Sequence, residues 1–284
     1  MVINCIEIAN KIYAAFHQDL IQLKQAKNAT IKMIIIKINN DKASEKYVNN
    51  KIKKAQELGI EAELIGDNIK NQEELLNTIK KLNNDPKTTG YIIQLPLPNG
   101  FDKDLIFDYV DITKDIDGLS SLAVSRNLND TKLFHPIPCT ARGIIEILKQ
   151  SNFEIASKNV VVVNRSLIVG KPLIGQLLHE NATVTICHSY TKDLKNITKN
   201  ADVVICAIGK PHFFDRQYFN PNCFVIDAGI SIVNQKSVGD VNFEDVKDYV
   251  KYITPVPNGV GKLTVAMIFK NLMELAKKQY YGTI

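Results

Sequence analysis

The sequence predicts an α/β protein with two α/β lobes and a cleft between them. Segments typical of strands alternate with segments of helical periodicity along the chain, which is the pattern of parallel α/β architecture. The chain has 284 residues, enough for two domains that each bury their own core. Residues 120–138 interrupt the alternation and show no regular pattern, so we predict that the junction between the lobes lies there.

The first lobe is predicted to contain a small parallel sheet. Met33-Ile-Ile-Ile36 is typical of a strand that is buried on both faces. Gly59 stands where a glycine would end a helix, and Pro96 and Pro98 stop the strand that precedes them. We expect helices over residues 6–27, 43–58 and 73–82 and strands over residues 30–39, 61–65 and 90–95.

The second lobe has the pattern of a Rossmann-like dinucleotide-binding domain. Val160-Val-Val-Val163 predicts a buried strand, which a polar turn connects to a helix that opens with Gly170 and Pro172. A helix that begins there presents its amide groups to a pyrophosphate. The glycine spacing usual for a dinucleotide turn is missing, so an ordinary strand-to-helix turn is the alternative. Further strands are expected over residues 183–187, 203–207 and 223–226.

The last predicted helix covers residues 262–278 and has apolar positions on most of its faces. Such a helix is buried, and we expect it to return to the first lobe. We therefore assign residues 1–138, joined by residues 262–284, to one domain and residues 139–261 to the other.

Composition limits the classes of function. Charged residues make up 23% of the chain and its net charge is +5, too mild and too scattered to indicate nucleic-acid binding. The N-terminus lacks a targeting pattern, and no apolar run is long enough to span a membrane. The cysteines are widely spaced and the histidines lack metal-ligand spacing. We expect no disulfide framework, no metal site and a cytoplasmic location.

Tyr47 and Lys51 are four residues apart and would share one face of a helix. Val48, Ile52 and Ala55 make an adjoining apolar stripe that would partly bury this face. A lysine at such an edge can take part in proton transfer, and a tyrosine hydroxyl can orient it. The alternative is a surface lysine whose aliphatic stem lies beside a core tyrosine.

Two other segments place polar groups where ligands gather. Gln94 is predicted at the carboxyl end of a buried strand, where its amide either binds a ligand or satisfies loop backbone. In Lys114-Asp-Ile-Asp-Gly118, the carboxylates face opposite sides of an extended chain. Asp117 is the better ligand-facing candidate because Gly118 allows close approach, and Asp115 is expected to pair with a nearby base. A solvated turn is the alternative.

A tight loop precedes the last helix. Its sequence is Pro255-Val-Pro-Asn-Gly-Val-Gly261, and its amide groups can contact the polar edge of a ligand or the nicotinamide side of a cofactor. The same loop is equally compatible with a turn that only leads into the helix.

Taken together and in this order, these segments resemble the bifunctional methylenetetrahydrofolate dehydrogenase/methenyltetrahydrofolate cyclohydrolase family. The resemblance extends over nearly the whole chain. The matching motifs are Tyr47-x-x-x-Lys51, Gln94-Leu-Pro-Leu-Pro98, Lys114-Asp-Ile-Asp-Gly118, Pro138-Cys-Thr-Ala-Arg-Gly143, Arg165-Ser-x-x-Val-Gly-x-Pro172, Asp227-Ala-Gly-Ile230, Val238-Gly-Asp-Val241 and Thr254-Pro-Val-Pro-Asn-Gly-Val-Gly261.

The resemblance implies that the protein oxidises 5,10-methylenetetrahydrofolate with a nicotinamide dinucleotide and then hydrolyses the methenyl product to 10-formyltetrahydrofolate, in one-carbon metabolism and purine biosynthesis. It implies that Lys51 is the principal catalytic group, positioned by Tyr47 and Gln94, and that Asp117 holds the pterin. An uncharged amine suits both steps, since it tolerates a developing cation and can help deprotonate water. The substrate site implied consists of Tyr47, Lys51, Ile93, Gln94, Leu95, Asp117, Pro257, Asn258, Gly259, Val260 and Gly261.

The resemblance also implies a cofactor site in the second lobe, with Asn164, Arg165 and Ser166 along the phosphates and Ser189 and Ile230 nearby. The predicted strand over residues 183–187 runs into a segment that holds no Asp or Glu to accept from a ribose 2′-hydroxyl. Arg165 and Ser189 can instead receive a 2′-phosphate, so we predict NADP. The alternative for Arg165 is a surface cation. Family members are commonly homodimers, so we expect a homodimer with no nucleic-acid or membrane partner.

Asn39, Asn164 and Asn258 stand where the family usually has glycine. Asparagine tolerates left-handed backbone better than other residues with a side chain, so we expect these loops to keep their shape. Asn164 is expected to enter the phosphate turn and weaken cofactor binding, and Asn258 to crowd the substrate or nicotinamide edge.

Three alternatives compete with this interpretation. In the first, the protein has lost either the dehydrogenase or the cyclohydrolase activity. The presence of all the candidate catalytic residues argues against this alternative. The second is a non-catalytic folate- or dinucleotide-binding homologue, which only the asparagines suggest. The third is another two-lobed dehydrogenase that acts on amino or hydroxy acids, which leaves the Tyr47/Lys51 pair and the Gln94 motif without an explanation.

Overall fold

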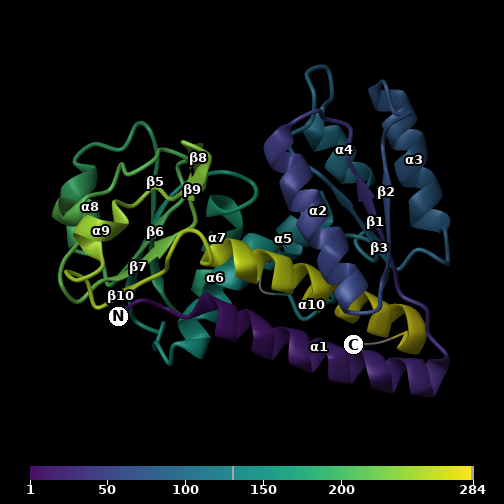
Figure 1. Cartoon of the computed structure of the whole chain (residues 1–284), viewed down its shortest axis with the longest axis horizontal. Coiled ribbons are helices and arrows are strands. Elements are labelled where there is room, and N and C mark those ends of the chain that lie inside the picture. The colour runs from purple at the N-terminus through teal and green to yellow at the C-terminus, as the bar shows by residue number, and fades with distance from the viewer. Residues whose placement is uncertain (130, 283–284) are drawn as a thin grey trace. The chain divides into compact units, whose positions relative to one another are not determined.

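A computed structural model of the chain describes residues 1–129 and 131–282, so residues 130, 283 and 284 of the predicted domains lie outside the described residues. Helices and strands alternate as predicted, and the chain divides into two compact units (Figure 1). We name each after its main sheet. The five-stranded unit comprises Met1–Ile12, Asn127–Asp130 and Pro138–Met267, and the three-stranded unit comprises Tyr13–Arg126, Thr131–Ile137 and Ile268–Ile284.

The five-stranded unit is built on a parallel sheet. Its strands are β4 (Asn159–Val163), β5 (Thr183–Cys187), β6 (Val203–Cys206), β7 (Phe224–Asp227) and β10 (Tyr252–Ile253). They lie in the order β10-β7-β6-β4-β5. The chain therefore reverses its direction across the sheet between β4 and β6, and open α/β sheets bind ligands at the carboxyl ends of the strands at such a switch point.

Helices and short elements complete this unit. Gly170 opens α7 because a Cβ there would lie 2.1 Å from the backbone oxygen of Asn164, so only glycine fits against the turn after β4. The helices are α6 (Cys139–Gln150), α7 (Gly170–His179), α8 (Leu194–Lys199), the 3-10 helix η1 (Arg216–Tyr218) and α9 (Phe243–Val246). An antiparallel hairpin joins β8 (Ser231–Val233) to β9 (Lys236–Val238).

The three-stranded unit holds a parallel sheet of β1 (Lys32–Ile36), β2 (Glu61–Ile65) and β3 (Gly90–Ile93), in the order β2-β1-β3. Its helices are α2 (Lys42–Glu57), α3 (Gln72–Asn84) and α4 (Lys103–Tyr109). The last four residues of the central strand β1 are buried, and Ile34 and Ile36 pack in one cluster with Leu75 and Ile79 of α3 and Ile106 of α4. This packing sets β1 and β3 side by side, so the segments after their carboxyl ends are neighbours.

Three helices contribute residues to both units. These are α1 (Cys5–Lys27), α5 (Ser121–Leu128) and α10 (Val260–Tyr281). The C-terminal part of α10 belongs to the three-stranded unit, where Phe269 meets Tyr13 and Phe16 in edge-on ring contacts. Among the described residues, no helix combines the length and the apolar composition that a bilayer crossing requires.

The prediction that residues 120–138 are irregular is wrong over α5. Ser120 lies directly before this helix and satisfies its first turn, since its Oγ accepts from the amide of Ala123 (3.4 Å) and its backbone oxygen accepts from the amide of Val124 (2.9 Å). A helix of eight residues is too short to give a clear periodicity. The helix α4, the β8–β9 hairpin and the strand β10 are likewise too short for the sequence pattern to predict them.

A close approach between α7 and Asn127 gives the first testable prediction. A Cβ at Gly175 would lie 2.4 Å from the backbone oxygen of Asn127, whose side chain also bonds to Pro172 and Gln176. We expect Gly175→Ala to lower the free energy of unfolding by about 1–3 kcal/mol, because the backbone must move apart. Urea unfolding followed by circular dichroism measures it.

The matched control is Gly261→Ala, because no atom lies within 4 Å of a Cβ built at that helical position. It should change the unfolding free energy by less than about 0.5 kcal/mol. Equal stability of the two variants would show that α7 does not need the glycine.

Candidate active site

The three-stranded unit brings Lys51 and Gln94 together. Lys51 lies on α2 and is only 7% exposed, and its Nζ donates to Oε1 of Gln94 over 3.0 Å. Gln94 follows the last residue of β3, the buried Ile93, so it stands at the carboxyl end of a parallel strand. A buried amine and an amide oxygen therefore meet at the sheet edge where the sequence places the chemistry.

Backbone contacts hold Gln94 in place. Its Nε2 donates to the backbone oxygen of Leu95 (2.8 Å), and the same oxygen accepts from Oγ of Ser44 (3.2 Å). Ser44 is 3% exposed and lies in the first turn of α2, where its amide donates to the capping carboxylate of Asp41 (2.6 Å). Sequence reasoning missed Ser44, because nothing in its local pattern indicates the distant partner.

Asn39 also supports this edge of the sheet. Its Nδ2 donates to the backbone oxygen of Pro96 (2.7 Å), and its Oδ1 accepts from the amide of Asp41 (3.1 Å). Its own backbone oxygen accepts from Nζ of Lys37 (2.6 Å). The asparagine therefore uses its side chain to tie the segment after β1 to the segment after β3. Asn39 does not have left-handed backbone, so the expected reason for an asparagine at this position does not apply.

Tyr47 lies one turn before Lys51 on the same helix and is half-buried. Burial raises the pKa of Tyr47 above its usual value, so its phenol stays protonated at neutral pH. It is therefore available as a hydrogen-bond donor on the helix face that also carries Lys51, rather than as a second base.

The segment from Asp115 to Ser120 forms a closed turn. Asp115 is 2% exposed and its carboxylate accepts from the amides of Gly118 (2.8 Å) and Ser120 (2.7 Å). Burial raises the pKa of Asp115 to about 6. The expectation that Asp115 pairs with a base is wrong, because two amides satisfy it. Asp117 is partly exposed at the tip of this turn, which leaves it as the carboxylate that faces outward.

In the five-stranded unit, Asn164 closes the turn between β4 and α7. Its Oδ1 accepts from the amides of Ser166 (2.7 Å) and Gly170 (3.0 Å), and its Nδ2 donates to the backbone oxygen of Ala207 after β6. The side chain thus spans the switch point of the sheet. The expected reason for asparagine here was wrong, since Asn164 does not adopt left-handed backbone. The amides of Ser166 and Gly170 are therefore occupied within the turn.

Two buried carboxylates organise the other loops at this edge. Asp227 accepts from the amides of Gly229 (3.1 Å), Asp240 (3.1 Å) and Val241 (2.9 Å). Asp240 is fully buried and accepts in turn from three successive amides of the segment after β6, those of residues 208–210. A Cβ at Gly239 would lie 1.9 Å from Oδ2 of Asp227, so the loop approaches the carboxylate as only glycine can. Sequence reasoning used these motifs for recognition but missed their role.

The predicted cofactor side chains surround the same edge. Arg165, Ser166 and Ser189 are exposed, and Ile230 is 45% exposed. Arg165 follows β4 and Ser189 follows β5, which are neighbouring parallel strands. Among the described residues, no carboxylate forms an ion pair with Arg165, and the turn after β5 holds no acid before Asp193. This donor set fits a dinucleotide that carries an additional phosphate on its ribose.

The loop before α10 is fixed by its backbone. Asn258 has φ 75°, so here the expectation of left-handed backbone is confirmed. Gly259 approaches Pro255 so closely that a Cβ would lie 2.0 Å from the backbone oxygen of Pro255. Pro257 and Asn258 are exposed, Val260 is buried, and Gly261 is exposed in the first turn of α10.

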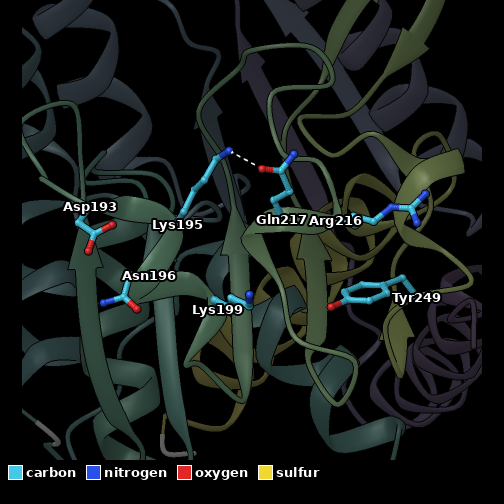
Figure 2. A pocket seen from close by; sticks show the side chains of 7 residues that line it. All are labelled: Asp193, Lys195, Asn196, Lys199, Arg216, Gln217 and Tyr249. Carbon is cyan, nitrogen blue, oxygen red and sulfur yellow. Dashed lines mark hydrogen bonds between the residues drawn. The ribbon is translucent and has the colours of Figure 1, made fainter.

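A shallow depression of about 530 Å³ lies elsewhere on the five-stranded unit, at α8 and η1 (Figure 2). Two of its cations have partners in the protein, since Lys195 donates to Gln217 (3.0 Å) and Arg216 pairs with Asp245. None of its lining residues is among the predicted site residues. Among the described residues, no group of three or more His, Cys, Asp or Glu side chains is placed to hold a metal ion.

The buried carboxylate Asp227 gives a prediction on pH dependence. Burial, with a contribution from Asp240, raises the pKa of Asp227 from 3.8 to about 7. The folded state therefore binds this proton more tightly than the unfolded chain, so the stabilisation is present below pH 4 and is lost as the pH rises to about 7. Asp227→Asn removes this dependence, and its unfolding free energy should fall less steeply in that window, by up to about 1.4 kcal/mol per pH unit.

Urea unfolding of both proteins at several pH values between 4 and 7 measures the two slopes. Parallel slopes would contradict the assigned titration of this carboxyl, whatever the absolute stability of the variant.

Comparison with known proteins places this geometry in a family. The model for "Tetrahydrofolate dehydrogenase/cyclohydrolase, catalytic domain" matches residues 3–117, and the model for the NAD(P)-binding domain of the same family matches residues 138–280. The bifunctional protein FolD of Malacoplasma penetrans is 60% identical over 280 residues, which cover 99% of this chain and 99% of that protein. That of Clostridium novyi is 46% identical, over 94% of this chain and 96% of its own.

Solved structures agree. The crystal structure of the bifunctional methylenetetrahydrofolate dehydrogenase/cyclohydrolase FolD from Campylobacter jejuni has a TM-score of 0.91 and 34% identity, and covers 98% of this chain and 99% of its own. The Trypanosoma brucei enzyme, solved with NADP and an inhibitor, has a TM-score of 0.89 and 31% identity, over 98% of this chain and 97% of its own. These findings confirm the resemblance and exclude another class of two-lobed dehydrogenase. The chain belongs to the tetrahydrofolate dehydrogenase/cyclohydrolase family.

Proposed function

We propose that the protein oxidises 5,10-methylenetetrahydrofolate with NADP and hydrolyses the resulting 5,10-methenyltetrahydrofolate to 10-formyltetrahydrofolate. The observation that carries this proposal is the buried amine of Lys51, held by Gln94 at the carboxyl end of β3. These groups lie in the segment that matches the catalytic domain of the family. On the strength of the family resemblance, we propose that they act at the one-carbon bridge of the substrate.

Lys51 manages the proton in the hydrolytic step. Water adds to the methenyl carbon while Nζ takes a proton from it, so that the carbon gains an oxygen and the amine gains a charge. The bond from this carbon to N5 then breaks: N5 receives the proton that Nζ carries, the new hydroxyl loses its proton to solvent, and the resulting formyl group stays on N10. Oε1 of Gln94 accepts an N–H from Nζ in either protonation state. The nitrogen therefore keeps its place before and after it takes the proton. The phenol of Tyr47 supplies a donor on the same helix face.

Asp117 holds the pterin through its ring N–H groups. Its position at the tip of the turn is set by Asp115, whose two hydrogen bonds to backbone amides close the loop. In the three-stranded unit, the buried Ile93 and its near neighbour Leu95 complete the proposed substrate-binding residues. In the five-stranded unit, we propose the residues from Pro257 to Gly261 as substrate-binding residues.

Asn164, Arg165, Ser166, Ser189 and Ile230 would hold the dinucleotide. A dinucleotide held by these residues would supply the acceptor for the hydride that leaves the one-carbon bridge. Asn164 acts indirectly. Its side-chain oxygen accepts from backbone amides of the turn and so fixes the turn that presents Arg165 and Ser166. Arg165 supplies the positive charge for a 2′-phosphate, which favours NADP over NAD.

Two alternatives stay within the family: loss of one of the two activities, and a homologue that binds its ligands without turnover. The asparagines that prompted the second alternative do not support it. Asn39 joins the loops after β1 and β3, and Asn164 joins the loops after β4 and β6, so each stabilises loops that carry proposed site residues. We further propose a homodimer in the cytoplasm, without nucleic-acid or membrane partners. All five cysteines are buried, and no disulfide joins any of them within the described part of the chain, which suits a reducing compartment. Sedimentation analysis tests the dimer.

Lys51→Met tests the catalytic assignment. The variant keeps the length and the apolar stem of the side chain but has no nitrogen to accept a proton. We expect methenyltetrahydrofolate hydrolysis to fall by at least about a hundredfold, with the fold retained. The measurement is the loss of methenyl absorbance with time.

Lys53→Met is the matched control, since Lys53 is exposed two residues further along the same helix. It should hydrolyse the substrate at the rate of the unchanged protein. Appreciable hydrolysis by the folded Lys51 variant would remove that residue from its role.

Arg165→Ala tests the choice of cofactor. We expect the Michaelis constant for NADP to rise about tenfold or more, while that for NAD changes little, because only NADP has a phosphate for the guanidinium to bind. Initial rates of methylenetetrahydrofolate oxidation with each dinucleotide measure both constants.

Arg216→Ala, which removes an exposed arginine of the depression at η1, serves as the control for lost positive charge. Equal effects of the Arg165 variant on NADP and NAD would refute the 2′-phosphate assignment.

A further inference from the structure

An exposed aromatic ring stands beside the predicted 2′-phosphate cation. Tyr190 is 79% exposed, more than any other large apolar or aromatic side chain described in the chain. It belongs to the turn that follows β5. An aromatic ring so far out of the core contributes little to folding, so its position needs another reason.

The turn that carries Tyr190 is fixed by its backbone. The amide of His188 donates to Oγ1 of Thr191 (2.8 Å), and the amide of Thr191 donates to the backbone oxygen of His188 (2.9 Å). The amide of Tyr190 donates to Nδ1 of His188 (3.2 Å), and the two rings meet edge-on with their centroids 6.2 Å apart. The ring of Tyr190 is therefore presented by a closed turn, although solvent surrounds it.

The guanidinium of Arg165 lies over this ring, with Cζ 5.6 Å from the ring centroid. Arg165 follows β4 and Tyr190 follows β5, and the ends of these strands are paired at Val163 and Cys187. The contact therefore joins two neighbouring loops at the carboxyl edge of the sheet. A cation over an aromatic face is attracted by the negative potential of the ring, and a flat guanidinium can stack there with its N–H groups still directed outward.

The contact reduces the entropic cost of ordering Arg165 when a ligand binds. An exposed arginine side chain has several rotatable bonds, and ordering it on a ligand opposes binding. Among the described residues, no carboxylate pairs with Arg165 to order it in advance. A carboxylate partner would also compete with a phosphate, whereas an aromatic ring orders the cation and leaves its charge uncompensated.

We propose that Tyr190 is a positioning residue for the 2′-phosphate of NADP, which acts by holding the guanidinium of Arg165 at the ends of β4 and β5. This inference rests on the proposed function, because it requires that Arg165 faces the cofactor. The ligand feature recognised is a phosphate monoester on an adenosine ribose. Ser189, which carries a hydroxyl, directly precedes Tyr190 in the sequence.

Isothermal titration of the whole protein with two adenosine nucleotides tests the proposal without turnover. Adenosine 2′,5′-bisphosphate carries the additional phosphate, and adenosine 5′-monophosphate lacks it. Tyr190→Ala should weaken the bisphosphate about threefold to fivefold and change the monophosphate by less than about twofold. Tyr190→Phe keeps the aromatic face and should bind both nucleotides as the unchanged protein does.

A double-mutant cycle separates the role of the ring from its own contacts with the nucleotide. In the Arg165→Ala background, Tyr190→Ala should have no additional effect on the bisphosphate, because the cation that the ring positions is absent. Tyr281→Ala is the matched control, since it removes another exposed ring that meets a lysine, Lys27, in the other unit.

The outcomes are distinct. Equal weakening of both nucleotides by Tyr190→Ala would mean that the ring stacks on the base and would overturn the proposal. So would additive effects of the two substitutions, or failure of Tyr190→Phe to restore affinity. If Arg165→Ala itself binds the bisphosphate normally, the assignment of Arg165 to the 2′-phosphate is wrong, and the inference about Tyr190 is then wrong as well. A normal Tyr190→Ala together with a weakened Arg165→Ala refutes the inference alone.

Discussion

The site depends on one requirement: a buried amine must have a hydrogen-bond acceptor. Lys51 is almost wholly inside the three-stranded unit, and Gln94 supplies the acceptor from the end of β3. A carboxylate there would hold the lysine as an ion pair, whereas a neutral amide oxygen satisfies the amine and leaves its proton exchangeable. The contacts of Ser44 and Asn39 with the segment from Gln94 to Pro96 follow from the same need, because they keep that acceptor from moving.

The two units use the same device to build a site. In each, side chains at the carboxyl ends of parallel strands bond to the backbone of the adjacent loop, so that the loops are ordered before a ligand arrives. Asn39 joins the segments after β1 and β3, and Asn164 joins those after β4 and β6. Asp240 adds three amides of the segment after β6 to its network. Such preorganisation lowers the entropy lost on binding and leaves the exposed groups, Arg165 among them, free to interact with the ligand.

The sequence was sufficient for the parts of the structure that obey a local rule. Apolar runs located β1 and β4, Gly59 marked the end of α2, and the motifs in order identified the family. Roles that depend on a partner far along the chain could not be found in this way. The local sequence predicts only that Asn164 tolerates left-handed backbone, whereas its side chain bonds to the backbone oxygen of Ala207, forty-three residues away. Asp115 was given a base as partner, while its partners are two amides of its own turn.

The central claim is that the amine of Lys51 meets the one-carbon bridge of a folate. A crystal structure of the protein with a bound tetrahydrofolate analogue tests it most directly. We expect Nζ of Lys51 within hydrogen-bond reach, about 2.6–3.2 Å, of a polar atom at the bridge or of one water bound there, with Gln94 still accepting from it. An analogue seated away from this amine, or Nζ turned into solvent, would contradict the account.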